Sequence, residues 1–159
     1  YSPGGGSSST RGIFGGGHPS VNIIEYVEIS TLGDAVDFGD LVTARRYPSG
    51  TSSPVRVVFA GGTTASSPYP PLNVMDFITT SSKGNATRFG DLYNGTGDAA
   101  GLSNSVRGVL AGGRNPSPET NIIQYINIST EGNSVDFGDL SYTGSTRSAA
   151  GLCNAHGGL

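Results

Sequence analysis

Residues 121–140 read NIIQYINISTEGNSVDFGDL, and the same pattern occurs twice more, as NIIEYVEISTLGDAVDFGDL at residues 22–41 and as NVMDFITTSSKGNATRFGDL at residues 73–92. The three blocks align without gaps. A shorter block precedes each of them: RGIFGGG from Arg11, RVVFAGG from Arg56 and RGVLAGG from Arg107. The chain is therefore built from a repeat of about fifty residues, a period typical of propeller and solenoid proteins.

Each repeat divides into four short segments that favour β-strands. In the third repeat, residues 107–111, 122–129 and 134–140 are rich in β-branched and aromatic residues, and a stretch of small and polar residues leads to the next repeat. Glycine, asparagine and proline clusters between them are turn signals. Four strands in about fifty residues are the content of one propeller blade. We predict an all-β fold of three four-stranded blades, with approximate repeats at 1–41, 42–92 and 93–140 and a further repeat starting in 141–159.

Composition narrows the classes of function. The 159 residues include 26 Gly, no Trp and a single Met, which favours tight turns over long helices. A net charge of −3 offers no basic stripe for phosphates, so we expect no nucleic-acid partner. No apolar run approaches the length of a membrane span, and the N-terminus does not resemble a secretion signal. The single cysteine, Cys153, cannot form an internal disulfide.

The double glycines at the end of the short block are expected to be structural. They are Gly61 and Gly62 in the second repeat and Gly112 and Gly113 in the third. We predict that they adopt a positive φ or allow a close backbone approach where the blades converge on the axis.

Two charged positions also recur once per repeat. They are the aspartates Asp40, Asp91 and Asp139 and the arginines Arg11, Arg56 and Arg107. The aspartates could form a ring of carboxylates or calcium ligands, but we favour a structural role in which they accept hydrogen bonds from turn amides. A planar guanidinium suits bidentate pairing with a carboxylate, so we hypothesise that the arginines pair with these aspartates.

Candidate catalytic residues are sparse. His18 and His156 lie in glycine-rich segments at opposite ends of the chain, without the spacing of a metal site. The glycines at 15–17 are not followed by the Gly-Lys-Ser/Thr of a phosphate loop. We therefore predict that the chain is not an enzyme and holds no metal or cofactor.

The segments after the double glycines vary between repeats and are the candidate binding surface, because rigid scaffolds carry recognition on their loops. Tyr69, flanked by prolines, is a rigid aromatic side chain suited to contact a protein or a sugar. The candidate binding residues are Tyr69, Pro70, Arg114 and Asn115. The alternative is that these loops only cover a blade edge.

The repeat resembles the kelch family. A double glycine ends one strand, an aromatic residue follows an acidic or amide residue in the next, and Phe and Leu stand a few residues apart in the last. These features are Glu25-Tyr26, Asp76-Phe77 and Gln124-Tyr125, then Phe38 with Leu41, Phe89 with Leu92, and Phe137 with Leu140. Kelch repeats usually have Trp where this chain has Phe. The Phe-Gly-Asp-Leu motif more specifically resembles the kelch-like repeats of virion structural proteins from marine bacteriophages, including cyanophages.

This resemblance implies a β-propeller that acts as a structural or binding module of a phage virion, in a tail, a fibre or the capsid surface. Its implied partners are other virion proteins, or a protein or glycan of the host surface. The alternatives are a cytoplasmic kelch-like interaction scaffold and a propeller-based carbohydrate-active enzyme. Three repeats cannot close a ring of roughly four to eight blades. We expect either additional repeats or a homo-oligomer to complete it, and favour the first.

Overall fold

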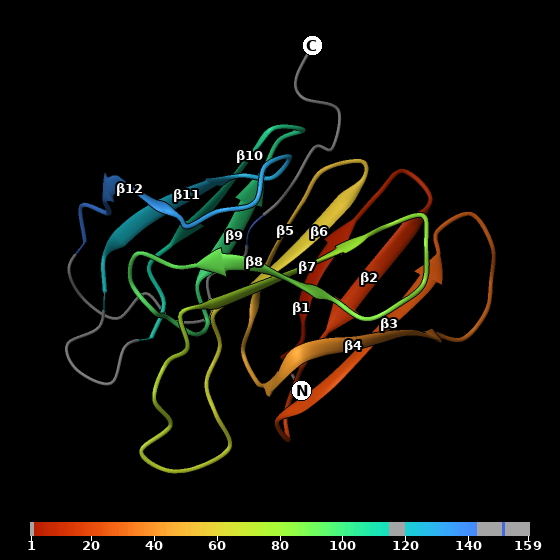
Figure 1. Cartoon of the computed structure of the whole chain (residues 1–159), viewed down its shortest axis with the longest axis horizontal. Helices are drawn as coiled ribbons and strands as arrows, with labels where there is room; N and C mark the ends of the chain where they lie inside the picture. The colour runs from red at the N-terminus through yellow and green to blue at the C-terminus, as the bar shows by residue number, and fades with distance from the viewer. Residues whose placement is uncertain (1, 115–119, 143–150, 152–159) are drawn as a thin grey trace.

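The computed structural model describes residues 2–114, 120–142 and 151. These residues form three four-stranded antiparallel sheets and no helix (Figure 1), so the prediction of an all-β fold with four strands per repeat is confirmed. We call the sheets blades 1, 2 and 3. Blade 1 holds β1 (Gly4–Ser7), β2 (Arg11–Gly15), β3 (Val21–Glu28) and β4 (Val36–Arg45). Blade 2 holds β5 (Ser49–Ser52), β6 (Arg56–Ala60), β7 (Val74–Thr79) and β8 (Thr87–Asp91). Blade 3 holds β9 (Ala100–Ser103), β10 (Arg107–Ala111), β11 (Ile122–Asn127) and β12 (Val135–Asp139).

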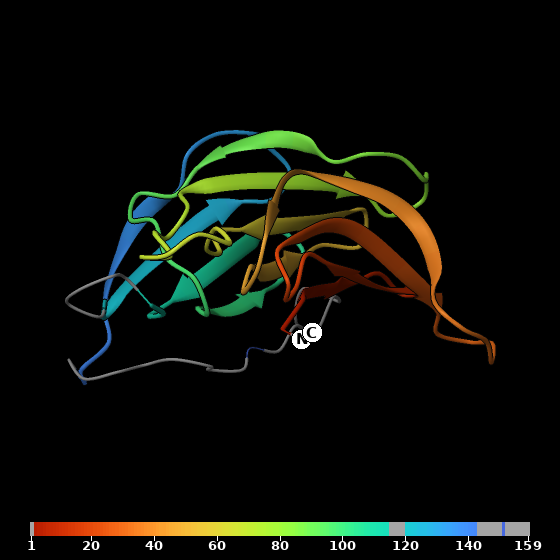
Figure 2. The ribbon, with the colours of Figure 1, turned by 90° about the horizontal axis from the view of Figure 1, so that it is seen from below.

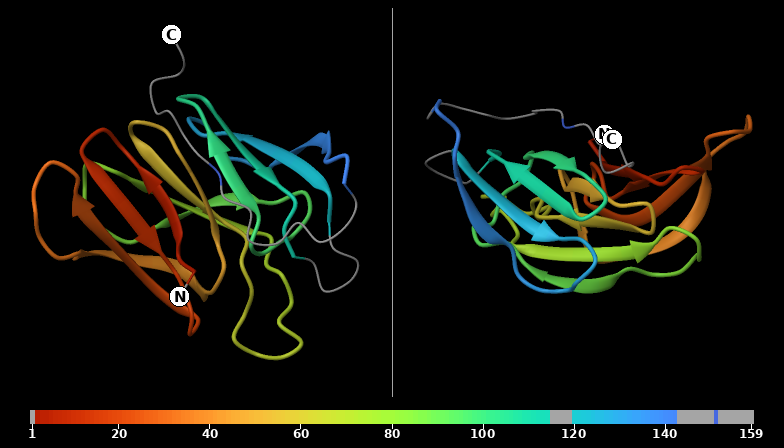
Figure 3. Two further views of the ribbon diagram at one scale, coloured as in Figure 1. Left: turned by 180° about the vertical axis from the view of Figure 1, so that it is seen from behind. Right: turned by 90° about the horizontal axis from the view of Figure 1, so that it is seen from above.

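The three blades fan out along an arc, with their first strands together on its concave side and their last strands along its convex side (Figure 2). Within each blade the strands follow chain order, each hydrogen-bonded to the next. Strand β5 lies between β1 and β9, as the view from behind also shows (Figure 3). The described residues do not close a ring.

The first strands carry small residues because the blades converge there. A Cβ atom added to Gly50 would collide with the main chain of Gly5, and one added to Gly101 would collide with that of Gly50. Larger residues at these positions would push the blades apart. The small and polar stretch of each repeat is therefore the strand nearest the axis.

The apolar residues form two clusters, one in each gap between blades. Strand β6 serves both: Val57 and Phe59 point toward blade 1, while Val58 and Ala60 point toward blade 3. Successive strand residues face opposite sides of a sheet, so a central blade covered on both faces needs this continuous apolar run. Blade 1 contributes Ile13, Ile24, Phe38 and Leu41 to the first cluster, and blade 3 contributes Leu110, Ile126 and Ile128 to the second.

The double glycines behave as the sequence indicates. Gly61 and Gly112 have φ angles of 64° and 65°, and Gly62 and Gly113 have 103° and 102°. L-residues with side chains rarely adopt these conformations. The second glycine of each pair also closely approaches the segment that leads into its own blade: a Cβ on Gly62 would lie 2.8 Å from the Arg46 carbonyl oxygen, and one on Gly113 would lie 2.8 Å from that of Gly97.

The Phe-Gly-Asp-Leu motif joins each blade to the next. The Gly84 amide of blade 2 donates to the Phe38 carbonyl of blade 1 at 2.9 Å, and Asp40 donates its own amide to Asn85 Oδ1 at 3.1 Å. Blade 3 repeats the arrangement against blade 2, where Gly132 donates to Phe89 at 2.9 Å. The bond from Asp91 to Asn133 Oδ1, at 2.9 Å, completes it. We call this set of bonds the blade hook.

The blade hook corrects the expected role of the aspartates. Their carboxylates were expected to accept hydrogen bonds from turn amides, whereas the main-chain amides of Asp40 and Asp91 donate to an asparagine side chain of the next blade. The Asp91 carboxylate pairs instead with Arg88 on its own strand. The repeated motif therefore contacts the next blade mainly through its main-chain groups.

The glycine of the motif is needed where a neighbouring blade is present. A Cβ on Gly39 would collide with the Gly84 carbonyl, and one on Gly90 with the Gly132 carbonyl. Gly138, the third copy, has no atom within 4 Å of that position. The close approach therefore belongs to the contact between blades.

We expect Gly90→Ala to lower the free energy of unfolding by about 1–3 kcal/mol, because its methyl group would overpack the junction between blades 2 and 3. Gly138→Ala is the matched control, since it adds the same methyl group in the same motif, where φ is also positive, but into open space. Urea unfolding of both variants in dilute solution measures the difference. Equal losses of stability would contradict the role of the glycine as a close-approach residue.

Candidate functional site

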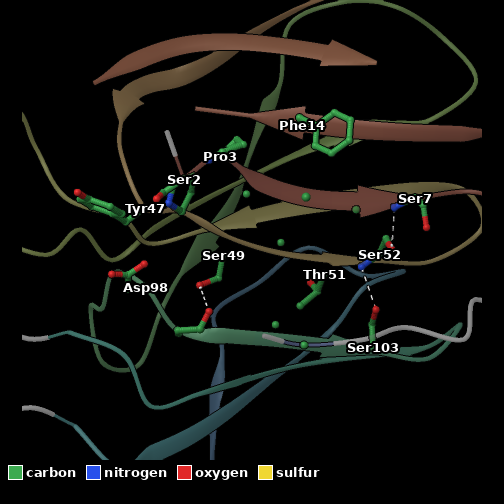
Figure 4. Close-up of a pocket in the computed structure, with 18 of the residues that line it drawn as sticks. Ser2, Pro3, Ser7, Phe14, Tyr47, Ser49, Thr51, Ser52, Asp98 and Ser103 are labelled. Carbon is green, nitrogen blue, oxygen red and sulfur yellow. Dashed lines mark hydrogen bonds between the residues drawn. The ribbon is translucent and has the colours of Figure 1, made fainter. Parts of the chain in front are cut away.

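A groove of about 550 Å³ runs along the concave side of the arc (Figure 4). We call it the axial groove. Its walls are β1, β5 and β9, which supply glycine backbone and the hydroxyl groups of residues such as Ser49, Thr51 and Ser103. Several hydroxyls already join neighbouring blades: Ser49 Oγ donates to the Ala99 carbonyl at 2.8 Å, and Ser103 Oγ accepts from the Ser52 amide at 3.1 Å.

Two residues with unusual backbone conformations lie at one end of the axial groove. Tyr47 and Asp98 occupy equivalent positions before β5 and β9, and their φ angles are 57° and 63°. The Asp98 amide donates to the Tyr47 carbonyl at 3.0 Å, which fixes the two turns together. Residues other than glycine are uncommon in this region, and such strain concentrates at binding and catalytic sites.

The variable loop of residues 63–72 contacts Arg46, the residue before Tyr47. The Arg46 guanidinium lies 4.2 Å from the ring centroid of Tyr69 in that loop and 5.8 Å from the ring centroid of Tyr47. Thr63 and Arg46 exchange main-chain hydrogen bonds of 3.1 and 2.8 Å, so the base of the loop is tied to the segment between β4 and β5 that carries Arg46. We call Arg46, Tyr47 and Tyr69 the aromatic cluster.

Only part of this cluster is predicted from the sequence. Tyr69 and Pro70 of the variable loop were candidate binding residues, and Pro70 is exposed beside Tyr69. Arg46, Tyr47 and Asp98 were not among the candidates, because Arg46 and Tyr47 align with Gly97 and Asp98 in the next repeat and so do not form a repeated motif. The feature of the sequence that could have indicated this site is the basic and aromatic pair Arg46-Tyr47, which stands shortly before the small residues of β5.

Arg114 lies at the base of the next variable loop, in blade 3. Its main chain exchanges hydrogen bonds with Gly97, at 2.6 Å from its amide and 3.1 Å to its carbonyl. This is the bridge that Thr63 makes with Arg46 one blade earlier. Asn115, the last candidate binding residue, lies outside the described residues.

The repeated arginines do not pair with the repeated aspartates, so that hypothesis is wrong. Instead each guanidinium lies over the aromatic ring of the neighbouring strand: Arg11 over Tyr26 at 4.7 Å, Arg56 over Phe77 at 4.6 Å and Arg107 over Tyr125 at 4.7 Å. Two of them also reach the following blade. Arg11 Nη1 donates to the Thr80 carbonyl at 2.8 Å, and Arg56 Nη1 to the Ser129 carbonyl at 3.0 Å. These arginines hold blades together.

We expect Arg56→Lys to lower the free energy of unfolding by about 1 kcal/mol, because an ammonium group stacks less well on Phe77 and is not held by that stacking where Arg56 Nη1 reaches two carbonyls of blade 3. Arg107 stacks on Tyr125 but has no such carbonyl partner among the described residues, so Arg107→Lys should lower the free energy of unfolding by less. Thermal unfolding of both variants compares them. A larger loss for Arg107→Lys would contradict the bridging role of Arg56.

One ion pair is completely buried between blades 1 and 2. Arg45 Nη2 lies 2.7 Å from Asp76 Oδ2, and neither side chain is accessible to solvent. Burial raises the pKa of the Asp76 carboxyl, an effect that the positive charge of Arg45 opposes. Arg45 Nε and Asp76 Oδ1 have no hydrogen-bond partner. A perturbed carboxyl can mark a functional site, but this one is sealed from any ligand and serves the blade junction.

The equivalent position in blade 3 is neutral. Gln124 replaces Asp76 there, donating Nε2 to the Asn94 carbonyl at 2.9 Å and accepting from Ser134 Oγ at 2.8 Å. The ion pair is thus specific to the first junction, and no repeated pattern in the sequence indicates it.

We expect Asp76→Asn to destabilise the fold by about 3–5 kcal/mol, because it leaves the Arg45 charge buried without a counter-charge. The double substitution Arg45→Met with Asp76→Leu removes both charges and should cost much less than the sum of Arg45→Met alone and Asp76→Leu alone. Urea unfolding of the single and double variants gives the coupling energy. Additive losses would contradict a direct ion pair.

The described residues contain no group of three or more His, Cys, Asp and Glu side chains that could hold a metal ion. Cys153 and His156 lie outside those residues. None of the described segments is a helix long and apolar enough to cross a membrane.

Comparison with protein-family models gives no match, and neither does comparison with curated proteins. Among solved structures, the chain is similar to that of YjhT, with a TM-score of 0.75 and 12% sequence identity. The match covers 96% of this chain and 56% of the YjhT chain, so this chain spans little more than half of that structure. At this identity the likeness concerns the fold alone, and it supports an all-β arrangement of propeller-like blades.

Proposed function

We propose that the chain is a non-enzymatic binding module of kelch-like propeller architecture, and that it recognises its ligand with the aromatic cluster at the end of the axial groove. The observation that carries this proposal is the stacking of Arg46 on Tyr69, 4.2 Å from the ring centroid, on a loop anchored to a rigid blade. Tyrosine and arginine supply much of the binding energy in protein interfaces. An aromatic residue that is already held in place loses little conformational entropy on binding.

The chemistry of this region favours a glycan. Tyrosine rings present flat apolar faces to the C–H groups of a sugar ring, and the guanidinium donates several hydrogen bonds to hydroxyls. The axial groove beside the cluster is lined by serine and threonine hydroxyls and by glycine backbone, which can donate to and accept from a polyhydroxylated ligand. A protein ligand would use the same aromatic and basic anchors.

The biological setting is proposed from the repeat itself. The Phe-Gly-Asp-Leu motif resembles the repeats of virion structural proteins from marine phages. We therefore propose that the chain belongs to a tail, a fibre or the capsid surface, and that its ligand lies on the host surface. The non-enzymatic assignment is supported by the use of the charged repeat residues: Arg11 and Arg56 bridge blades, and Asp76 is buried in an ion pair.

We expect the isolated chain to bind a subset of glycans on an array of microbial polysaccharides, and Tyr69→Ala to weaken that binding at least tenfold, or about 1.4 kcal/mol. Tyr93→Ala is the control, because it removes an equally large exposed side chain that follows β8, away from the cluster. Titration calorimetry with the best glycan measures both. Binding that Tyr69→Ala leaves unchanged, or the absence of any glycan ligand, would contradict the proposal.

A further inference from the structure

Arg46 carries a positive charge that has no counter-charge in the fold. Among the described residues no carboxylate pairs with it, whereas three other arginines, Arg11, Arg45 and Arg88, each have one. Its Nε atom donates to Thr63 Oγ1 at 3.4 Å, and its terminal amino groups have no hydrogen-bond partner in the described part of the chain. The side chain is only half-buried. The fold therefore holds this guanidinium in place and leaves most of its donors unused.

Two aromatic rings orient the Arg46 guanidinium. Its Cζ atom lies 4.2 Å from the ring centroid of Tyr69 and 5.8 Å from that of Tyr47. A ring that stacks on a guanidinium covers a face of the plane and leaves the N–H groups at the edge of the plane accessible. Those N–H groups form a rigid fork that can donate to two oxygens of one anionic group. Arg46 is thus oriented to bind an anion before any ligand arrives.

A second arginine without a carboxylate partner is joined to the same place. Arg114 directly follows the double glycine of its repeat, as Thr63 does one repeat earlier. Its main chain pairs with Gly97, and the next residue, Asp98, donates its amide to the Tyr47 carbonyl at 3.0 Å. None of the ion pairs among the described residues includes Arg114. Positive charge therefore collects around this turn.

The charges of the aromatic cluster and of the axial groove differ. Asp98 is the one acidic side chain among the described residues that line the groove, whose other polar groups are hydroxyls and main chain (Figure 4). It forms an ion pair with neither Arg46 nor Arg114. A ligand is therefore attracted by its negative charge at Arg46 and by its neutral hydroxyls in the groove.

From this arrangement we infer that the ligand is an acidic saccharide whose anionic group, a uronate carboxylate or a sulfate ester, is bound by Arg46. The inference rests on the proposed function, because it names the class of glycan that the same site recognises. Arg46 donates two N–H groups to the anion, and the charge of Arg114 adds to the attraction. Hydrogen bonds between two charged groups are about twice as strong as those between neutral groups, so the site prefers an acidic glycan to its neutral form.

An array of polysaccharides tests this preference when each acidic member is printed beside its neutral form. Polygalacturonate is paired with its methyl ester, and a sulfated galactan with its desulfated form. We expect the acidic form of at least one pair to bind at least about tenfold more tightly than its neutral form. The pair that shows the preference distinguishes a carboxylate from a sulfate ester. Raising the NaCl concentration from about 0.05 M to about 0.5 M should weaken binding of the acidic form only, because salt screens the half-exposed guanidinium.

Two arginine variants connect the preference to Arg46. In titration calorimetry with oligosaccharides of the preferred pair, Arg46→Gln should lower the ratio of acidic to neutral affinity at least about fivefold. Arg88→Gln is the matched control, since it removes the same charge from β8, where the guanidinium pairs with Asp91. This control should leave the ratio unchanged. Circular dichroism confirms that each variant is folded.

The outcomes separate this inference from the proposed function. Glycans that bind equally well in acidic and neutral form, or an array on which only neutral glycans bind, would overturn the inference and leave the proposed function in place. An Arg46→Gln variant that keeps the full preference, or an equal loss in Arg88→Gln, would also overturn it. An array without any bound glycan would overturn both.

Discussion

The fold depends on the close approach of one blade's Phe-Gly-Asp-Leu strand to the Gly-Asn turn of the next. Main-chain bonds of 2.9 Å from Gly84 to Phe38 and from Gly132 to Phe89 cross this contact. They form only because Gly39 and Gly90 have no side chain to separate the two backbones. The apolar clusters then fill the gaps between blades, and the arginines close the same gaps at the rim by reaching the carbonyls of the following blade.

Most of the blade architecture could be predicted from the sequence because it is repeated. Three copies of one pattern specify four strands each, and the double glycines correctly indicated a positive φ. Repetition does not show which repeated residues face each other. The arginines and aspartates recur with the same period, yet the arginines stack on Tyr26, Phe77 and Tyr125. Recurrence also could not separate side-chain from main-chain use of the aspartates.

The features that could not be predicted are those present once. The buried Arg45 and Asp76 pair has a neutral counterpart in blade 3, and the aromatic cluster combines a strand end with a loop that differs in every repeat. Such contacts join residues that are distant in the chain and follow no period. The candidate site is therefore a local departure from a regular scaffold, which is where rigid folds usually carry recognition.

Native-state hydrogen exchange, followed by NMR on dilute protein, tests most directly whether the blade hook holds the fold together. The amides of Gly84 and Gly132 donate across blade junctions, whereas Gly33 occupies the same turn on the outer face of blade 1. If the blade hook holds the fold together, the amides of Gly84 and Gly132 exchange only through large-scale unfolding, and the amide of Gly33 exchanges quickly. Rapid exchange at Gly84 and Gly132, equal to that at Gly33, would contradict it.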